Sequence, residues 1–456
     1  MNKTIKNEVL FETAPVPQAL ATLAVPTIIS QLITLVYNLA DAYFVGRTGN
    51  TYMIAAVSLV YPVFSMTAAL ANLFGVGGGS LISRLLGAKQ DKQAEKVCVF
   101  SFYAAILVSL FFSLGSFLFL KPILKLLGAS PDTMEYARQY MLLVIVLGTI
   151  PTVLSATMAH LLRSIGYARQ AGVGLSLGAG LNIVLDPLFM FVLLPAGWEV
   201  AGAALATMLS NTIAAIYFLI MILRLQKTTS LCLRLSVGLP ECKNISLVLS
   251  VGLPSALTVL FYDVANVFLN KLMSLHGDYQ LAALGIVLKA ERLPLNTGVG
   301  LCQGMMPLVA YNYAAKNERR MNAIIRTARI SGLIVSAFSI LLYEVFSGSI
   351  VRVFISTSAG NVADAARTVG FGISFLRYRC LAAPFAFMNF HITYTLQAMG
   401  DGKNTLMLAA LRQCIFYIPI MFIMNYFFGA DGLVWTQIIA ELITLCIAFG
   451  ILKKKT

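Results

Sequence analysis

Residues 18–44 read QALATLAVPTIISQLITLVYNLADAYF, a stretch with no Lys or Arg and a single acid, Asp41. A helix needs about 20 apolar residues to cross the hydrocarbon core of a bilayer, so this stretch is long enough to span it. Lipid does not tolerate unpaired backbone groups, which leaves a helix as the expected conformation. Eleven comparable runs follow, at about residues 53–83, 97–120, 139–162, 170–194, 200–223, 245–270, 280–310, 325–346, 372–397, 405–428 and 432–452.

The composition agrees with an all-α polytopic membrane protein of twelve transmembrane helices. Hydrophobic residues make up 59% of the 456 residues and charged residues 11%, against about 45–50% and 25% in soluble proteins. A compact soluble core cannot bury so much apolar surface, so a soluble globule is excluded. A transmembrane β-barrel is also excluded, because its strands are about 10 residues long and alternate strictly.

The positions of the residues that give the net charge of +14 indicate a membrane protein rather than a nucleic-acid-binding protein. Most Lys and Arg residues stand in short patches between apolar runs, without a long basic tract or an RNA-recognition motif. The connections between the runs form two alternating sets, one on each side of the membrane. The set that includes both termini holds 20 Lys and Arg residues, and the other set holds 7. Because cationic loops face the cytoplasm, the bias predicts two cytoplasmic termini and a multi-pass protein of the inner (plasma) membrane. The seven cysteines are scattered and indicate neither a disulfide framework nor a metal site.

The chain repeats itself at an offset near 230 residues. Pro26 and Asn38 in the first run correspond to Pro254 and Asn266 in the seventh. Each half holds an even number of spans, so the two copies share one orientation, as in transporters with parallel repeats around a central cleft. We expect an N-lobe of residues 1–225, a cytoplasmic linker of residues 226–244 and a C-lobe of residues 245–456. Residues 231–235 of the linker are apolar enough to lie along the membrane surface.

Carboxylates within the spans are the first candidates for function, because each costs at least about 2.5–3.5 kcal/mol in a membrane helix. Asp186 stands directly before Pro187, and Asn182 lies one helical turn earlier on the same face. Together with Asp41, and with a hydroxyl from Thr207, they predict a site of hard oxygen atoms that suits a proton or Na⁺. The structural alternative is that each acid pairs with a polar or basic neighbour.

Charged residues of the second half are weaker candidates. Asp263 and Glu291 are open to both interpretations, and Glu291 has Lys289 and Arg292 as neighbours for an ion pair. Arg412 is an isolated cation that we expect to pair with an acid, such as Glu441, or to adjust the pKa of a carboxylate. The remaining acid, Glu344, is expected to be solvated near a span end.

A glycine-rich run, residues 74–80 (FGVGGGS), is not a phosphate loop. It lacks the Gly-Lys-Ser/Thr sequence that would follow, and it lies inside a span. Small residues at such a position favour close helix packing. No ATP-hydrolysing motif occurs in the chain, so transport would be driven by an ion gradient, without a cofactor.

These motifs resemble the multidrug and toxic compound extrusion (MATE) family, and several details resemble its bacterial MepA-like branch. The resemblance covers nearly the whole chain and rests on residues 26–46 (including Gln31, Asn38 and Gly46), 182–187 and 202–207. It implies two pseudo-symmetric six-helix lobes. It also implies that Asp41, Asn182, Asp186 and Thr207 are cation-coupling residues, with Asp41 and Asp186 as Na⁺ ligands if sodium is the ion. Pro26 and Tyr37 match first-helix positions linked with bending and gating.

The resemblance implies a secondary active antiporter that exchanges Na⁺ or H⁺ for small organic cations or drugs. Some relatives carry coupling acids in the C-lobe, where this chain offers Asp263 and Glu291, but its tenth predicted span contains no acid. Arg412 is a further candidate for a C-lobe contribution. We expect a monomer in contact with membrane lipids. The alternatives are a lipid-linked oligosaccharide flippase of the same superfamily, which needs a more cationic cleft, and a non-transporting membrane enzyme or receptor, which needs a reactive constellation.

Overall fold

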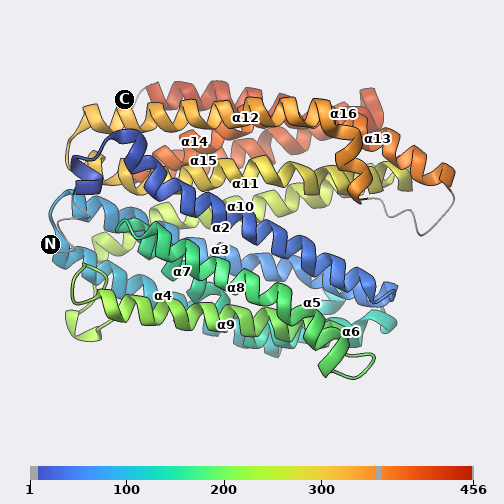
Figure 1. Cartoon of the computed structure of the whole chain (residues 1–456), viewed down its shortest axis with the longest axis horizontal. Coiled ribbons are helices and arrows are strands. Elements are labelled where there is room, and N and C mark those ends of the chain that lie inside the picture. The colour runs from blue at the N-terminus through green and yellow to red at the C-terminus, as the bar shows by residue number, and fades with distance from the viewer. Residues whose placement is uncertain (1–8, 355–361, 454–456) are drawn as a thin grey trace.

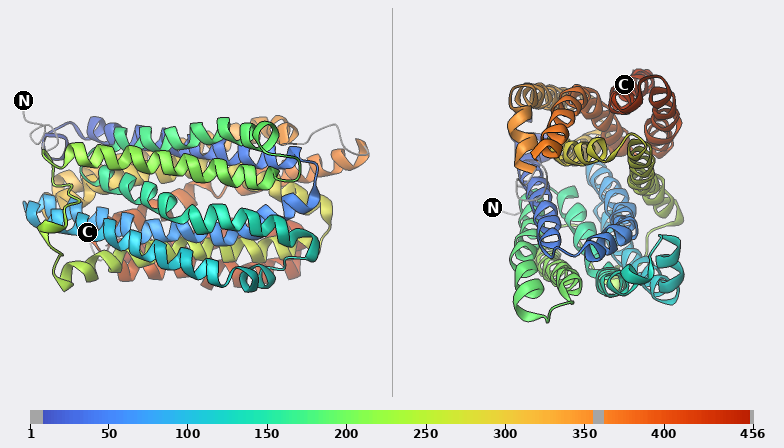
Figure 2. Two further views of the ribbon diagram at one scale, coloured as in Figure 1. Left: turned by 90° about the horizontal axis from the view of Figure 1, so that it is seen from below. Right: turned by 90° about the vertical axis from the view of Figure 1, so that its right-hand side faces the viewer.

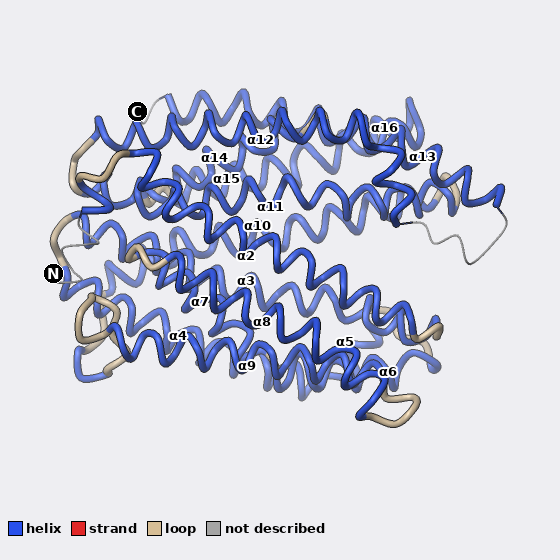
Figure 3. Tube along the Cα trace, viewed as in Figure 1, coloured by secondary structure: helices blue, strands red, loops and turns tan. Residues whose placement is uncertain are grey.

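The computed structural model describes residues 9–354 and 362–453. Within these ranges the chain is almost entirely helical and has no strand (Figure 1, Figure 3), so the predicted all-α fold is confirmed. The helices of the first half are α2 (Val16–Arg47), α3 (Thr51–Gly87), α4 (Asp91–Leu118), α5 (Leu120–Leu126), α6 (Pro131–Met141), α7 (Thr149–Ser164), α8 (Ala168–Leu188) and α9 (Glu199–Leu225). The second half contains α10 (Cys242–Ser274), α11 (Asp278–Ala314), α12 (Glu318–Phe354), α13 (Val362–Cys380), α14 (Ala383–Met399), α15 (Gly402–Ala410) and α16 (Ile418–Lys453).

Four short elements complete this set. Three are π-helical turns that continue the α-helices beside them: η1 (Leu142–Leu147), η2 (Phe189–Leu193) and η4 (Leu411–Tyr417). The fourth, η3 (Leu235–Val237), is a single 3₁₀ turn in the connection between the halves.

Length and apolar composition allow eight of the described helices to cross a membrane, and a pair bent by 47°, Pro131–Leu147 with Thr149–Ser164, makes a ninth. One of the eight, the continuous segment Gly402–Lys453, has 52 residues and would be about 78 Å long if straight, far more than a hydrocarbon core of about 30 Å. It turns at Gly429, where φ is 58°, and therefore supplies two crossings. Helix α11 and the pair α13–α14 are not among these apolar helices and lie at the positions of the eighth and tenth predicted spans.

The tenth span differs from its predicted range of 372–397. Helix α13 begins at Val362 and ends at Cys380, and α14 begins at Ala383 with Pro384 in its first turn. Proline has no N–H to donate to the preceding turn, so it is compatible with a new helix start but not with an uninterrupted helix. The fourth span also begins before its predicted start at 139, because Ser130 and Thr133 form a capping box at the start of α6.

The two halves of the chain occupy opposite parts of the molecule, with the first half below and the second half above in Figure 1; the end-on view in Figure 2 separates them again. They meet where α2 packs on α11 and α3 packs on α10. Gly304 of α11 lies so close to the backbone of Ala24 that a Cβ would stand 2.5 Å from its Cα. Gly252 of α10 likewise lies against the carbonyl of Leu73. The halves therefore touch backbone to backbone.

The glycine-rich run packs as predicted. Gly75 lies against His160 of α7, Gly77 against Gly252 of α10, and Gly78 against Ser101 of α4. Small residues let the helix backbones approach closely, which larger side chains would prevent. Helix α3 consequently contacts helices of both halves through one short segment.

The connection between the halves is folded onto the first half. Leu231 and Leu233 are buried in a cluster with Val97 and Val248, and the Tyr103 hydroxyl donates to the carbonyl of Leu233 at 3.1 Å. Residues 231–233 thus pack against the helix bundle, and whether residues 231–235 also lie along the membrane surface stays a prediction. The side chains of residues 231–233 are all buried, and the local sequence alone does not reveal the helices that cover them.

Candidate functional site

Close helix contacts bring the predicted acids of the first half together. Gly172 of α8 lies under the carbonyl of Pro26, where a Cβ would stand 2.8 Å from the oxygen. This approach fixes α2 beside α8 and brings Asp41 within electrostatic range of Asp186. Pro187 follows Asp186 and has no N–H for the helix ladder, and α8 passes at once into the π-helical turn η2.

Asn182 and Asp186 share one face of α8, and Asn182 reaches α9. The Asn182 side-chain amide donates to the Thr207 hydroxyl at 3.2 Å. Asp186 is 0% exposed, Asn182 2% and Thr207 6%, and Asp41 is partly exposed on α2. The structure thus brings all four predicted cation-coupling residues to one region.

Several oxygen atoms of this region are buried without a hydrogen-bond donor. They are Asp41 Oδ1, Asn182 Oδ1 and both carboxylate oxygens of Asp186. Within residues 9–354 and 362–453, neither acid forms an ion pair with Lys, Arg or His. A buried carboxylate without a partner is costly, so this arrangement requires a cation or a proton. We refer to Asp41, Asn182, Asp186 and Thr207 as the oxygen site.

Two tyrosines border the oxygen site. Tyr37, one helical turn before Asp41, and Tyr140 of α6 both lie within electrostatic range of Asp41 and Asp186. Sequence reasoning selected Tyr37 through the family resemblance but missed Tyr140, because nothing in the local sequence of α6 relates it to α2. No group of three or more His, Cys, Asp or Glu side chains converges in the described residues, so two acids and neutral oxygens are what the site offers an ion.

The charged candidates of the second half are arranged differently. Glu291 of α11 forms a bidentate pair with Arg379 of α13, rather than with its sequence neighbours Lys289 and Arg292. Sequence reasoning did not single out Arg379. Asp263 lies near Arg292 and has one buried, unpartnered carboxylate oxygen. Of these two candidates, Glu291 is compensated by an ion pair, and Asp263 lies beside a cation.

Arg412 is paired with Glu441, as one of the predicted alternatives requires. The distance from Arg412 Nη2 to Glu441 Oε1 is 2.6 Å, and Gln437 and Asn389 donate to the same carboxylate. The guanidinium also stacks over the ring of Phe390, 4.1 Å from its centroid. These contacts satisfy both charges within the bundle.

Comparison with known proteins identifies the family. The MatE family model matches twice, over residues 26–188 and 254–423, so the matches begin at the two prolines that the sequence repeat aligns. Together they cover more than half of the chain. This chain belongs to the MATE family.

Relatives within the MATE family extend over nearly the full length. The chain is 32% identical to the multidrug export protein MepA of Staphylococcus aureus (strain MSSA476) over 96% of this chain and 93% of the relative. The crystal structure of a MATE protein in complex with MaL6 has a TM-score of 0.91 at 24% identity, with 100% of both chains covered. An outward-facing MATE family transporter of the MOP superfamily also has a TM-score of 0.91 at 24% identity, with 100% of this chain and 98% of the other covered. These structures establish the MATE fold, and family membership makes this chain a membrane transporter rather than an enzyme.

Proposed function

We propose that this MATE transporter is a secondary active multidrug efflux antiporter. It exchanges Na⁺ or H⁺ for organic, mostly cationic, amphipathic compounds by alternating access and contributes to antibiotic resistance. The observation that carries the proposal is the group of buried oxygens on Asp41, Asn182 and Asp186 that receive no hydrogen bond. The name of the relative MepA, a multidrug export protein, supports the substrate class.

The oxygen site is proposed to couple the ion to the drug. A cation that binds there neutralises a buried charge and changes the relative stability of the arrangements in which the site is open or closed. Only a ligand with different affinities for the two arrangements can shift their balance. A proton needs one carboxylate, whereas Na⁺ also uses neutral oxygens such as Asn182 Oδ1, so the donor set favours Na⁺ slightly.

Tyr37 and Pro26 are proposed to serve this coupling through α2. Pro26 interrupts the hydrogen-bond ladder of the helix that carries Asp41. Tyr37 stands between this interruption and the acid, where it responds to the charge on Asp41. The helix is thus able to change its curvature when the acid is neutralised.

In the C-lobe, we propose a structural contribution for Glu291 and Arg412, because each already has an opposite charge as its partner. Asp263 is the remaining candidate for a second ion or drug contact, since one of its oxygens has no donor. We propose lobe boundaries at residues 1–225 and 245–456, a linker of residues 226–244, cytoplasmic termini, and a monomer that contacts membrane lipids.

The test measures dye efflux from cells or vesicles with a Na⁺ gradient and a proton gradient imposed separately. Asp41→Asn and Asp186→Asn are expected to abolish gradient-driven efflux while the protein remains folded in the membrane. Asp132→Asn, an exposed acid of α6, is the matched control and should retain efflux. Full efflux by both oxygen-site variants would overturn the assignment, and the gradient that drives the wild type identifies the ion.

A further inference from the structure

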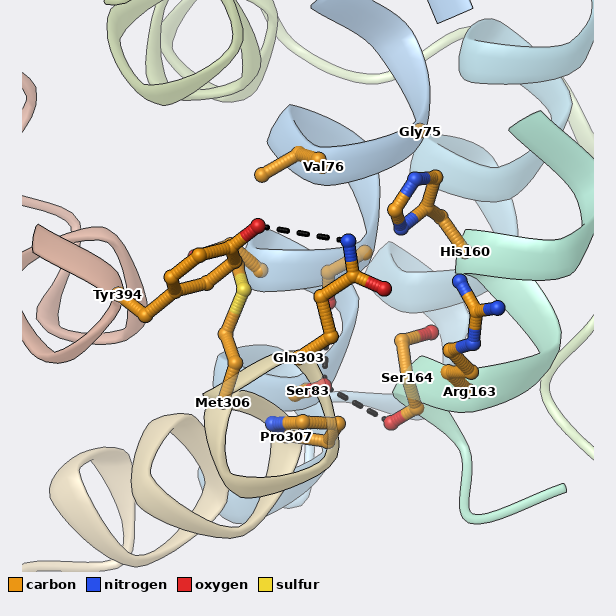
Figure 4. Close-up of a pocket in the computed structure, with 12 residues that line it drawn as sticks. Gly75, Val76, Ser83, His160, Arg163, Ser164, Gln303, Met306, Pro307 and Tyr394 are labelled. Atoms are coloured by element: carbon orange, nitrogen blue, oxygen red, sulfur yellow. Dashed lines mark hydrogen bonds between the residues drawn. The ribbon is translucent and has the colours of Figure 1, made fainter. Parts of the chain in front are cut away.

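A second polar site lies between the two halves and shares no residue with the oxygen site. Its cavity has a volume of about 320 Å³, including the space at its open mouth. The walls come from α3 and α7 of the first half and from α11 and α14 of the second (Figure 4). The lining residues are Gly75, Val76, Gly79, Ser80, Ser83, His160, Arg163, Ser164, Gln303, Met306, Pro307 and Tyr394.

Arg163 gives this cavity an uncompensated positive charge. The residue is only 4% exposed, and its Nε and Nη2 atoms are buried without a hydrogen-bond partner. None of the twelve residues that line the cavity is Asp or Glu. Arginine stays protonated in proteins, so it cannot remove the charge by losing a proton. A buried charge of this kind is stable only with a partner of opposite sign.

A chain of hydrogen bonds across the interface leaves another donor at the cavity. The Gln31 amide donates to Gln303 Oε1 at 3.1 Å, and Gln303 Nε2 donates to the Tyr394 hydroxyl at 3.4 Å (Figure 4). Because the Tyr394 oxygen accepts this bond, its own hydrogen remains to be donated. No acceptor for it occurs in the described chain, and the hydroxyl borders the cavity.

The serine hydroxyls of the cavity already donate hydrogen bonds to backbone carbonyls, so they are not donors for a ligand. Ser80 donates to the carbonyl of Gln397 at 2.6 Å, Ser83 to that of Ser164 at 2.8 Å, and Ser164 to that of Leu161 at 2.7 Å. The hydrogens of these three hydroxyls are therefore unavailable to a ligand. His160 lies beside Arg163 on α7 (Figure 4) and adds a ring N–H. The free donors are thus Arg163 and His160 from the first half and Tyr394 from the second.

We propose that this cavity binds a small inorganic anion of the size of chloride. Water accepts hydrogen bonds from a guanidinium but does not neutralise its charge, and a cation would be repelled. The neutral donors beside Arg163 add no second positive charge, so the site suits a singly charged anion. Because Arg163 comes from α7 of the first half and Tyr394 from α14 of the second, an anion bound in this cavity stabilises the arrangement in which the halves are packed together here.

The test is the thermal unfolding of the purified, full-length protein in lipid nanodiscs. Sodium chloride replaces sodium gluconate stepwise at constant ionic strength. The Na⁺ concentration stays constant, so occupancy of the oxygen site by Na⁺ does not change during the titration. The expected result is a saturable rise of Tm with chloride, and also with bromide, as for any ligand that binds only the folded state. A Tm that does not depend on the anion means that the cavity holds water, and overturns the proposal.

Two variants connect this effect with the cavity. Arg163→Met should abolish the saturable rise, and Tyr394→Phe, which removes one neutral donor, should weaken the apparent affinity about fivefold. Arg169→Met, which removes an exposed arginine of α8, should respond like the wild type. A chloride effect that persists in Arg163→Met overturns the proposal. If Arg163→Met does not fold, anomalous diffraction from bromide-soaked crystals of the wild type provides the test. An anomalous bromide peak in the cavity supports the site, and the absence of a peak there refutes it.

Discussion

Arg379 donates two hydrogen bonds to the carboxylate of Glu291, from Nε to Oε2 at 2.7 Å and from Nη2 to Oε1 at 2.8 Å. The two side chains are 3% and 13% exposed, so the pair lies inside the bundle and joins α13 to α11. The acids of the oxygen site have no such partner. This difference separates an acid that stabilises the fold from acids that are available to an ion.

The first prediction concerns this pair. Glu291→Gln leaves the Arg379 charge buried without its partner and should destabilise the protein by about 3–5 kcal/mol, seen as a lower Tm of the purified protein. Efflux per folded molecule should keep its dependence on the driving cation. Glu135→Gln, which removes an exposed pair with Arg138, should change Tm little. A Glu291→Gln protein with a wild-type Tm but without cation dependence would instead make Glu291 a coupling acid.

The second prediction concerns the hydroxyl of Thr207. It accepts the hydrogen bond that orients the Asn182 amide, so that Asn182 Oδ1 remains free. Thr207→Ala should lower the apparent affinity for Na⁺ about fivefold, the effect of one neutral hydrogen bond, while Thr207→Ser should resemble the wild type. The measurement is dye efflux as a function of external Na⁺. Equal losses in both variants would show that the Thr207 methyl group, rather than its hydroxyl, matters.

The third prediction uses two glycines of α11. Gly304→Ala places a methyl group against the backbone of Ala24, whereas Gly285→Ala meets no atom within 4 Å. Gly304→Ala should force α2 and α11 apart, lower Tm and reduce efflux, because backbone atoms cannot rotate away. Gly285→Ala should keep or slightly raise stability, since alanine is the better helix former. Equal Tm values for the two variants would contradict the close packing of the halves.

The fold was predictable because lipid restricts the choice of structure. The twelve spans and the repeat were visible as apolar runs and as the correspondence of Pro26 with Pro254. The break at Pro384 was missed, because one proline within an apolar run is also compatible with a continuous, kinked helix. The protein contacts of residues 231–233 were not predicted, because an apolar segment can be covered by lipid or by protein.

The oxygen site was predictable in its acids but not in its surroundings. Asp41 and Asp186 stand out in a sequence that has few charges within its spans, and Asn182 follows from helical spacing. Tyr140 lies within electrostatic range of the acids, and Arg379 pairs with Glu291, across the bundle, where no fixed spacing in the sequence applies. The choice between an ion pair and a free carboxylate at Glu291 likewise depends on a helix 88 residues away in the chain.

The fourth prediction concerns the segment before α2. Arg320 donates to the carbonyls of Leu10, Phe11 and Ala14, at 3.2, 2.7 and 2.6 Å, and so fastens residues 10–14 to α12. Arg320→Ala should increase hydrogen exchange of this segment about tenfold or more, since a hydrogen bond to a charged group contributes about 1.5–3 kcal/mol. Arg319→Ala, its exposed neighbour, is the control. Unchanged exchange in Arg320→Ala would mean that other contacts hold the segment.

The fifth prediction is a pH dependence at the same end of the molecule. Lys89 and the Tyr311 hydroxyl hydrogen-bond to Glu12, at 2.7 and 2.6 Å, and these bonds lower the pKa of Glu12 below its usual 4.5. A carboxyl whose pKa is lowered in the folded state adds stability above its unfolded pKa and loses it as the pH falls through the folded value. Wild type should therefore exceed Glu12→Gln in Tm at pH 7, and the difference should shrink below pH 4.5. Because the pair is partly exposed, the difference should be small and should decrease with salt. A difference that grows as the pH falls would reverse the sign and refute the assignment.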